Sequence, residues 1–308
     1  MRSSVVPSAL CAALISLAAA APAHAYCLTR TCDPTKEVCD HVGNCVTSGH
    51  VLFWPNSCVS YDVQKDGSAK LGISYDTVHE VAIRAFDQWQ RADCGGGANP
   101  SINVVDNGAV DCAKPEYNKA QPNANVVTFH DSPWTYTNTT DTVALTTVFF
   151  NADTGEIYDA NVEINSAQYD LMDGLPARPD PSRDALDLNA VLTHEFGHFL
   201  GLSHSDNMPN ATMYASYNDD MATLDPDDVE AICASLPPNR STASNDCTPR
   251  HGFSGACGSP ETGCCATAIG RSASQQQSLG LFALGLGFCA WTGRRRFRRP
   301  GSRWALRR

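Results

Sequence analysis

The segment His194–His204, with the sequence HEFGHFLGLSH, places the strongest constraint on what this 308-residue chain can fold into. His194 and His198 are four residues apart, so on an α-helix their side chains project from the same face. Gly201 can end that helix with a positive φ angle, and the chain then returns His204 to the same place. The spacing therefore predicts a helix, a sharp turn and a cluster of three imidazoles.

The residue types in this segment point to a catalytic metal site. Three neutral imidazoles leave one position of a tetrahedral zinc ion open for water, whereas a structural zinc has four protein ligands. The metal would lower the pKa of that water to about 7. We expect Glu195 to accept the water proton and to deliver it to the departing amine of a cleaved peptide. Two histidines at this spacing can also be a coincidence, but Gly201, His204 and the downstream Met213 extend the pattern.

Three helices are indicated by apolar residues at helical spacing and by capping residues. Asp225–Pro226 is a strong start signal, because aspartate is a good N-cap and proline fits the first helical position. The expected helices are 77–89, with Thr77 and Glu80 as a capping box and Gly95–Gly97 after its end, 187–200, and one that follows Pro226 and stops at Pro237–Pro238.

Four short stretches, β-branched or alternating and bounded by turn residues, predict strands. They are residues 102–105, 126–129, 143–150 and 161–165. A helix, then strands, then two helices indicates an α+β domain built on one sheet.

The ends of the chain differ in composition from its middle. Residues 1–25 contain a short apolar run followed by Ala23-His24-Ala25, which is typical of a secretory signal peptide and its cleavage site. A membrane anchor is the alternative, but the apolar run is shorter than the roughly 20 residues that a spanning helix needs. The expected organisation is a signal peptide at 1–25, a cysteine-rich leader at 26–50, the catalytic domain at 51–238, a cysteine-containing linker at 239–265 and a sorting or membrane tail at 266–308.

Fourteen cysteines are present, and twelve remain when Cys11 in the signal peptide and Cys289 in the tail are set aside. An even number in a chain predicted to leave the cytosol favours disulfides, whose pairing cannot be deduced from the sequence. The alternative is a zinc site made by the four cysteines of the leader, Cys27, Cys32, Cys39 and Cys45.

Charge is distributed unevenly along the chain. Of the 22 basic residues, ten are Arg2, Arg271 and the eight arginines from Arg294 onward, so residues 26–270 hold 12 basic residues against all 33 acidic ones. The resulting balance of −21 repels nucleic acid, and it suits a soluble extracellular surface or bound calcium. We therefore expect no nucleic-acid partner.

The histidine motif resembles that of the metzincin metallopeptidases, whose pattern H-E-x-x-H-x-x-G-x-x-H is matched at every fixed position and is followed by Met213 in a candidate Met-turn. Within that clan the chain is similar to the matrixins, because Ser205 follows the third histidine and Asp227–Asp228 stands in the closing helix; the similarity spans about residues 51–236. It implies a twisted mixed sheet with three helices, one catalytic zinc, and protein substrates bound as an extended strand. It also implies that Met213 forms a hydrophobic floor beneath the metal and that Tyr217 walls the specificity pocket.

Several departures from the matrixin pattern are visible. Ala215 stands where the animal enzymes usually have proline, which bears on the shape of the specificity pocket, and only His79 and His130 are available before the active-site helix for a second, structural zinc. Calcium could bind the acidic stretches 153–156 and 219–220, although turns and caps explain them equally well. The leader is too short for the usual latency propeptide, so a leader cysteine that blocks the metal is an alternative to a disulfide-bonded one.

The tail, with Gly263–Cys265, an apolar run at 279–292 and an arginine cluster from Arg294, is similar to the C-terminal sorting signal of myxobacterial surface proteins. This similarity implies a bacterial source and an enzyme that is secreted or held at the cell surface. A plain membrane anchor is the alternative, because a basic cluster after an apolar run stays on the cytoplasmic side. We expect a monomer that touches the membrane only through this tail. The alternative function is a catalytically silent metzincin-like module for binding or adhesion, against which Glu195 argues.

Overall fold

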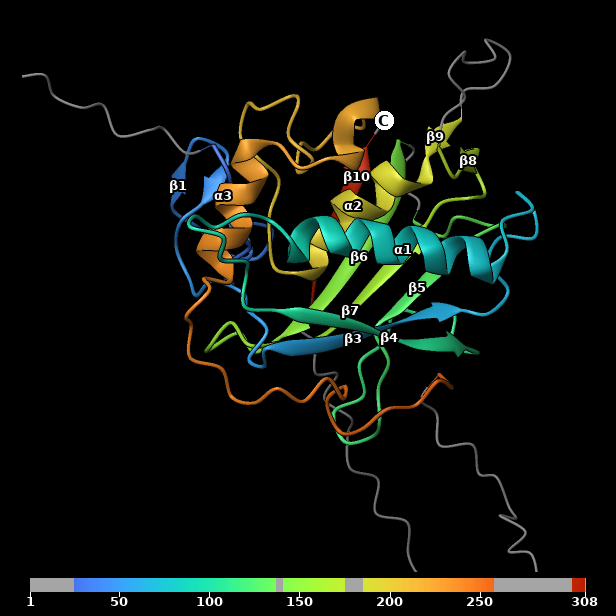
Figure 1. Ribbon diagram of the computed structural model, residues 1–308, viewed down its shortest axis with the longest axis horizontal. Helices are drawn as coiled ribbons and strands as arrows, with labels where there is room; N and C mark the ends of the chain where they lie inside the picture. The colour runs from blue at the N-terminus through green and yellow to red at the C-terminus, as the bar shows by residue number, and fades with distance from the viewer. Residues whose placement is uncertain (1–24, 137–140, 175–184, 258–300, 308) are drawn as a thin grey trace, which may run out of the picture.

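A six-stranded mixed sheet carries the helices of the protein on one of its faces (Figure 1). The computed structural model describes residues 25–136, 141–174, 185–257 and 301–307. In their order across the sheet, the strands are β10 (Gly301–Arg307), β6 (Thr142–Phe150), β7 (Ile157–Ile164), β5 (Val126–Phe129), β3 (Cys58–Gln64) and β4 (Asn103–Val110). Strands β7, β5, β3 and β4 are parallel to one another, whereas β6 is antiparallel to β7 and β10 is antiparallel to β6. The expected mixed sheet is confirmed.

Three α-helices are present in the described part of the chain, as the sequence predicted. They are α1 (Tyr75–Gln90), α2 (Leu188–Phe199) and α3 (Pro226–Ser235), and a 3₁₀ turn, η1 (Asp219–Ala222), precedes α3. Two small ribbons complete the structure: β1 (His41–Val42) with β2 (Cys45–Val46), and β8 (Leu171–Met172) with β9 (Leu186–Asp187). Figure 1 shows α1 and α2 side by side above the sheet.

The caps of the helices explain where each one starts. The N-cap of helix α1 lies three residues before the predicted one. It is the extended Ser74, and not Thr77: the Ser74 hydroxyl accepts from the Thr77 N–H at 3.2 Å. The helix ends at Gln90, before the three glycines. Helix α2 starts directly after Asp187, where the predicted helix begins, and α3 starts after Asp225 with Pro226 at its first position, which confirms the predicted start signal of α3.

Aromatic side chains pack α1 and α2 against the sheet. The rings of Phe86 on α1 and Phe196 on α2 are stacked with their centroids 3.6 Å apart, and Tyr61 of β3 lies beside both. The indole N–H of Trp89, which is fully buried, donates to the backbone oxygen of Thr193 at 2.8 Å. Truncation of such a buried aromatic typically costs about 3–5 kcal/mol, so this contact holds α2 firmly in place.

The strand expectations are partly right. Strand β5 has the predicted bounds and β6 starts one residue earlier than predicted. Strand β4 ends five residues later than predicted, and β7 starts four residues earlier. Strand β3, which the sequence did not reveal, occupies the centre of the parallel part of the sheet. Its sequence, CVSYDVQ, alternates apolar and polar residues, but all seven are buried because both faces of the sheet are covered.

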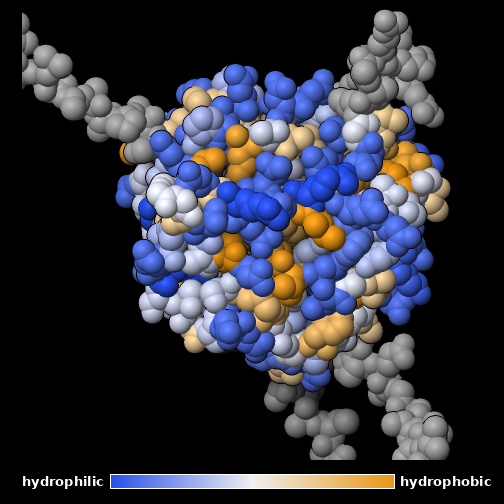
Figure 2. Space-filling model, in the orientation of Figure 1, coloured by the Kyte–Doolittle hydropathy of each residue, from blue (hydrophilic) through white to orange (hydrophobic). Residues whose placement is uncertain are grey.

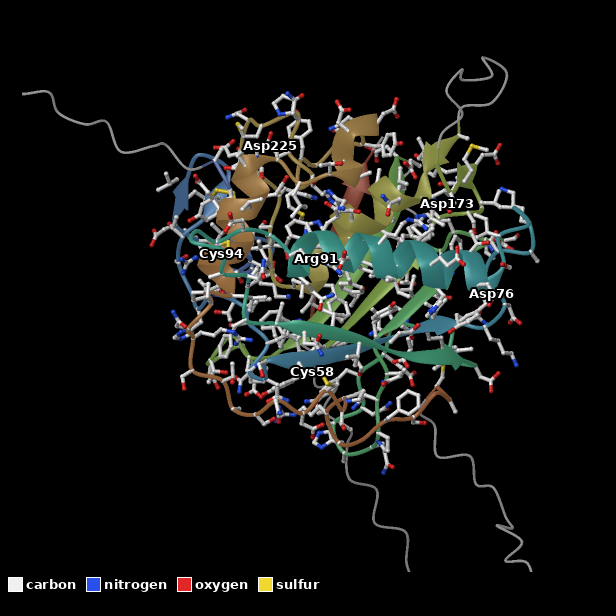
Figure 3. The ribbon with its side chains drawn as sticks, in the orientation of Figure 1. Cys58, Asp76, Arg91, Cys94, Asp173 and Asp225 are labelled. Atoms are coloured by element: carbon white, nitrogen blue, oxygen red, sulfur yellow. A yellow bond between two sulfur atoms is a disulfide. The ribbon has the colours of Figure 1, made fainter. Side chains whose placement is uncertain are left out.

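Ten of the twelve cysteines form disulfides, which confirms the favoured expectation for them. The pairs are Cys27–Cys45, Cys32–Cys39, Cys58–Cys247, Cys94–Cys233 and Cys112–Cys257. The leader cysteines therefore form neither a zinc site nor a metal-blocking thiol, and both of those alternatives are wrong. Cys58 on β3 and Cys94 after α1 are labelled in Figure 3. Cys264 and Cys265 lie outside the described residues.

Two segments without long elements are tied onto this framework. The leader packs beside the end of α2, where the Thr29 N–H donates to the Gly201 oxygen at 3.0 Å and the Ser203 N–H donates to the Cys27 oxygen at 2.9 Å. Coil 239–257 crosses the face of the sheet opposite the helices (Figure 1) and is fastened there by two of the disulfides. The predicted domain boundaries remain a prediction, and the signal peptide and the apolar run at 279–292 lie outside the described residues.

The surface agrees with the acidic, polar composition. Hydrophilic residues cover most of the face in Figure 2, with small hydrophobic patches between them. Within the described ranges, no helix has the length and apolar character needed to cross a membrane.

Candidate metal centre

The three histidines of the motif come together at the end of α2. His194 and His198 lie one helical turn apart and are buried, and His204 reaches them after a reversal of the chain. The reversal depends on Gly201, whose φ is +99° and whose missing Cβ would lie 2.9 Å from the Leu52 oxygen. The Nε2 atom of His198 is 3.1 Å from that of His194 and 3.2 Å from that of His204.

Backbone oxygens set the tautomers of the two helical histidines. The Nδ1–H of His194 donates to the Thr212 oxygen at 2.6 Å, and the Nδ1–H of His198 donates to the Leu202 oxygen at 2.9 Å. Their Nε2 atoms therefore carry lone pairs that point toward one another. Burial, with the nearby His204, lowers the pKa of His194 to about 3 and that of His198 well below its usual range, so both rings are neutral.

This arrangement fits a zinc ion. Lone pairs about 3 Å apart repel one another unless a cation lies between them. Zinc–nitrogen bonds of 2.0–2.1 Å in tetrahedral geometry place two ligand nitrogens roughly 3.3 Å apart, close to the distances in this cluster. Within the described residues, the cluster is one of two groups of potential ligands; the other, around Cys112 and Cys257, is occupied by a disulfide.

Glu195 lies beside the cluster on α2 and is fully buried. The hydroxyl of Thr146, in the middle of β6, contacts one oxygen of its carboxylate and donates to its backbone oxygen at 3.2 Å. Because Thr146 joins β6 to α2 at this point, it holds the Glu195 side chain in one orientation. The motif alone did not indicate Thr146, since it comes from a distant strand.

Helix α3 supports the histidines through a turn around Met213. The Asp228 carboxylate accepts from the N–H groups of Thr212 at 2.7 Å and Met213 at 3.0 Å, and the Thr212 oxygen in turn receives the ring N–H of His194. Burial raises the pKa of Asp228 to about 6, although backbone donors favour its charged form. A chain of hydrogen bonds thus connects α3 to His194.

The match with known protein families falls on this same region. The model of the family Matrixin matches residues 107–235, which include all three histidines, Glu195, Met213 and Asp228. The match supports a matrixin-like metallopeptidase. With the sheet and helices described above, it confirms the α+β, metzincin-like fold class, and it supports zinc as the metal. A comparison with curated proteins found no match.

The matched stretch is shorter than the similarity inferred from the sequence. It begins inside β4, so residues 51–106, with β3 and α1, lie outside it. The residue roles assigned from the matrixin resemblance, the bacterial source and the sorting tail remain predictions.

Met213 packs against Gly197 of α2, between Glu195 and His198 in the sequence. Its side chain is buried, and a Cβ added to Gly197 would lie 2.2 Å from its sulfur and 2.9 Å from the ring of Trp89. The glycine between Glu195 and His198 therefore allows the Met213 turn to approach α2 closely.

Tyr217, the expected specificity residue, is half-buried against the core. Its hydroxyl accepts the N–H of Asp187 at 2.9 Å, so it also fastens the start of α2. Ser205, the residue after the third ligand, donates to Asp227 of α3 at 2.8 Å, and its N–H donates to the Met213 oxygen at 2.8 Å. Both residues thus tie the matrixin-like site to its neighbouring helices.

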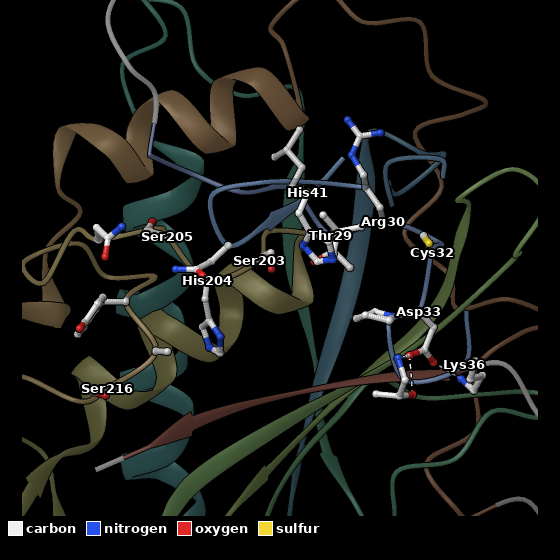
Figure 4. Close-up of a pocket in the computed structure, with 18 residues that line it drawn as sticks. Thr29, Arg30, Cys32, Asp33, Lys36, His41, Ser203, His204, Ser205 and Ser216 are labelled. Carbon is white, nitrogen blue, oxygen red and sulfur yellow. Dashed lines mark hydrogen bonds and ion pairs between the residues drawn. The ribbon is translucent and has the colours of Figure 1, made fainter. Parts of the chain in front are cut away.

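A cavity of about 750 Å³ opens beside His204 (Figure 4). One wall is the leader, with Thr29, Asp33 and His41 among its lining residues, and the other is formed by residues 203–205 and 214–216. Sequence reasoning did not place the leader at the site, because its residues have no motif and are positioned by disulfides and distant backbone contacts.

The histidines considered for a second matrixin zinc lie apart from each other. His79 of α1 contacts Asp106, and His130 is 2.8 Å from Glu163. Neither belongs to a group of three potential metal ligands among the described residues.

The stretches considered for calcium, 153–156 and 219–220, lie in a turn and in η1, and calcium there remains a prediction.

Proposed function

We propose that the protein is a zinc metalloendopeptidase that hydrolyses peptide bonds in proteins. His194, His198 and His204 would hold the metal, and Glu195 would act as general base and then as general acid. The observation that carries this proposal is the convergence of three imidazole Nε2 atoms beside a buried carboxylate, with the neutral rings of the two helical histidines fixed by backbone oxygens.

The protein side of the reaction follows from the surroundings of Glu195. Zinc, when bound, supplies the Lewis acidity that polarises water and the substrate carbonyl. The Glu195 carboxylate takes a proton from the attacking water and gives it to the amine as the peptide bond breaks. The Thr146 hydroxyl keeps that carboxylate in place, and burial removes competing solvent.

The substrate is a polypeptide in extended form. Strand β6 is the outermost of the five strands β6, β7, β5, β3 and β4, and its Thr146 contacts Glu195. A peptide that pairs with this edge would pass over the metal, and backbone hydrogen bonds would align it with little dependence on sequence. Met213 would form the hydrophobic floor of the metal site. Tyr217 would contribute to the pocket for the side chain that follows the cleaved bond.

We also infer that the enzyme works outside the cytosol as a secreted or surface-held monomer. Five disulfides in the described residues favour an oxidising compartment, and the predicted signal peptide provides a route to it. The bacterial source and the processing of the tail rest on the sequence alone.

The test compares three forms of the chain, each secreted into an oxidising compartment. They are the parent, Glu195→Gln, and Glu80→Gln, which makes the same chemical change on the exposed face of α1. We expect about one zinc per chain in all three, and chelator-sensitive cleavage of casein only in the parent and the control.

Two results would count against the proposal. Absence of bound zinc from the folded parent would remove the metal mechanism. Bound zinc without cleavage of any protein substrate would favour the alternative, a silent metzincin-like binding module.

A further inference from the structure

Strand β10 adds a sixth strand to the sheet, next to β6, which is the outermost of the other five strands. Gly301–Arg307 pairs with β6 in antiparallel register, from Gly301 opposite Phe149 to Leu306 opposite Ala144. Residues 258–300 separate this strand from coil 239–257, so β10 is distant in sequence from every other strand of the sheet. Its backbone nevertheless occupies the full length of the β6 edge.

The register places β10 beside the part of β6 that contacts Glu195. Trp304 is the Cα partner of Thr146, and Thr146 is the residue whose hydroxyl contacts Glu195. The backbone of β10 also lies close to α2, which carries His194 and His198.

A substrate strand and β10 cannot use this edge together. An edge strand presents one row of free N–H and C=O groups, and each group pairs with one neighbouring strand. The proposed function needs that row to align a peptide across the metal. On that basis, we propose that segment 301–307 is an intramolecular, strand-shaped inhibitor that occupies the substrate position until it is displaced or removed.

Because segment 301–307 is attached to the same chain, weak binding to β6 is sufficient for it to occupy the edge most of the time. A tethered segment experiences an effective concentration of about 1 mM. If the free segment bound β6 with a Kd of about 0.1 mM, roughly ten in eleven molecules would have the edge occupied. The inhibitor would still exchange readily with a tight substrate.

The predicted membrane tail suggests what releases the segment. If the apolar run 279–292 entered a membrane with its arginines on the cytoplasmic side, residues 301–307 would be carried away from a domain held outside. Pairing with β6 and insertion of the tail therefore exclude each other. The inhibited form is the one in which the tail is neither inserted nor cleaved.

The experiment compares the chain that contains residues 301–308, verified by mass spectrometry, with one that stops at Pro300. At equal zinc content and equal circular dichroism, the shortened chain should cleave a fluorogenic peptide about 10-fold faster. A synthetic peptide of residues 301–308, added to the shortened chain, should raise KM and leave kcat unchanged. No increase in rate on shortening, or inhibition that lowers only kcat, overturns the proposal.

Backbone methylation separates strand pairing from other kinds of binding. Alternate N–H groups of a strand point to opposite edges, so only one set of them can face β6. We expect N-methylation of alternate residues in one set, either 301, 303, 305 and 307 or 302, 304 and 306, to abolish inhibition while the other set retains it. Equal effects of both sets would contradict strand pairing.

A binding measurement keeps this inference separate from the proposed function. A fluorescent form of the peptide is titrated into zinc-loaded Glu195→Gln lacking residues 301–308, and its anisotropy is followed. If no form of the protein cleaves substrate, the proposed function fails, but peptide binding still reports on the β6 edge. If the parent enzyme is active and the peptide does not bind, the inhibitor proposal fails alone.

Discussion

Buried ionisable groups on the two faces of the sheet differ in their hydrogen-bond partners. On the helix face, Asp228 and the rings of His194 and His198 are buried, and each is bound to backbone groups. On the outer face, under coil 239–257, Asp159 is equally buried, yet one of its carboxylate oxygens accepts no hydrogen bond from the described residues. The ionisable groups of the helix face are therefore held by backbone partners, whereas the outer face carries buried carboxyl groups that weaken the fold.

Asp62 is a second buried carboxyl group on the outer face that destabilises the fold. It alternates along β3 with Val59, Tyr61 and Val63, which belong to the core on the helix side, so its carboxyl projects to the other face. Burial and the nearby charge of Asp106 raise the pKa of Asp62 to about 7. Burial also raises the pKa of Asp159 well above its usual value. Two buried carboxyls without adequate donors oppose folding at neutral pH.

The largest effect is expected on the helix face, from Asp228→Asn. The amide would turn an N–H donor toward backbone N–H groups that now donate to the carboxylate, and would leave Thr212 or Met213 unpaired in the interior. We expect a loss of about 3–5 kcal/mol in the free energy of unfolding, and zinc affinity about 10–100-fold weaker. Urea titration at pH 8 and competition with a zinc chelator measure the two quantities. Unchanged zinc affinity would show that α3 does not support the ligands.

We expect disulfides to be the main interaction that holds coil 239–257 on the outer face of the sheet. Cys58–Cys247 has a sequence separation of 189 residues, but the Cys94–Cys233 bridge shortens the loop it closes to roughly 50 residues. Loop entropy predicts a loss of about 4 kcal/mol when both Cys58 and Cys247 are changed to alanine, against about 2 kcal/mol for Cys32 and Cys39, seven residues apart. Thermal unfolding of both double variants measures the difference. Equal losses would mean that coil 239–257 adds little to stability.

How far the sequence predicts this molecule depends on how local each signal is. Helix α3 was predicted with its N-cap, because Asp225 and Pro226 act on backbone groups within one turn, and α2 was predicted to start at about Asp187. The three histidines were predicted for the same reason. Strand β3 was missed, because its polar residues look solvent-facing and only distant coil makes them buried. Thr146 could not be predicted either, since only the pairing of distant segments brings it to the site.

The third prediction is a gain in stability from Asp62→Asn on the outer face. The unfolded carboxyl ionises near pH 4, whereas the folded one stays protonated until about pH 7, so the parent loses stability as pH rises between these values. The amide does not ionise. We therefore expect equal stability at pH 4 and a variant more stable by about 1–3 kcal/mol at pH 8, after allowance for the buried amide. Chemical denaturation across this range measures the difference. A variant less stable at pH 8 would mean that the Asp62 charge is compensated in the fold.

The smallest effect is expected from the same substitution away from both faces, Asp173→Asn. Asp173 forms an ion pair with Arg84, but the two side chains are 36% and 46% exposed, so water and salt screen the interaction. We expect a change below about 0.5 kcal/mol in the free energy of unfolding, with zinc content and cleavage rate unchanged. One chemical change, aspartate to asparagine, should thus weaken the helix face at Asp228, strengthen the outer face at Asp62 and leave the surface neutral at Asp173. If Asp173→Asn cost as much as Asp228→Asn, removal of a negative charge alone would explain the effects, and the contrast between the two faces would not hold.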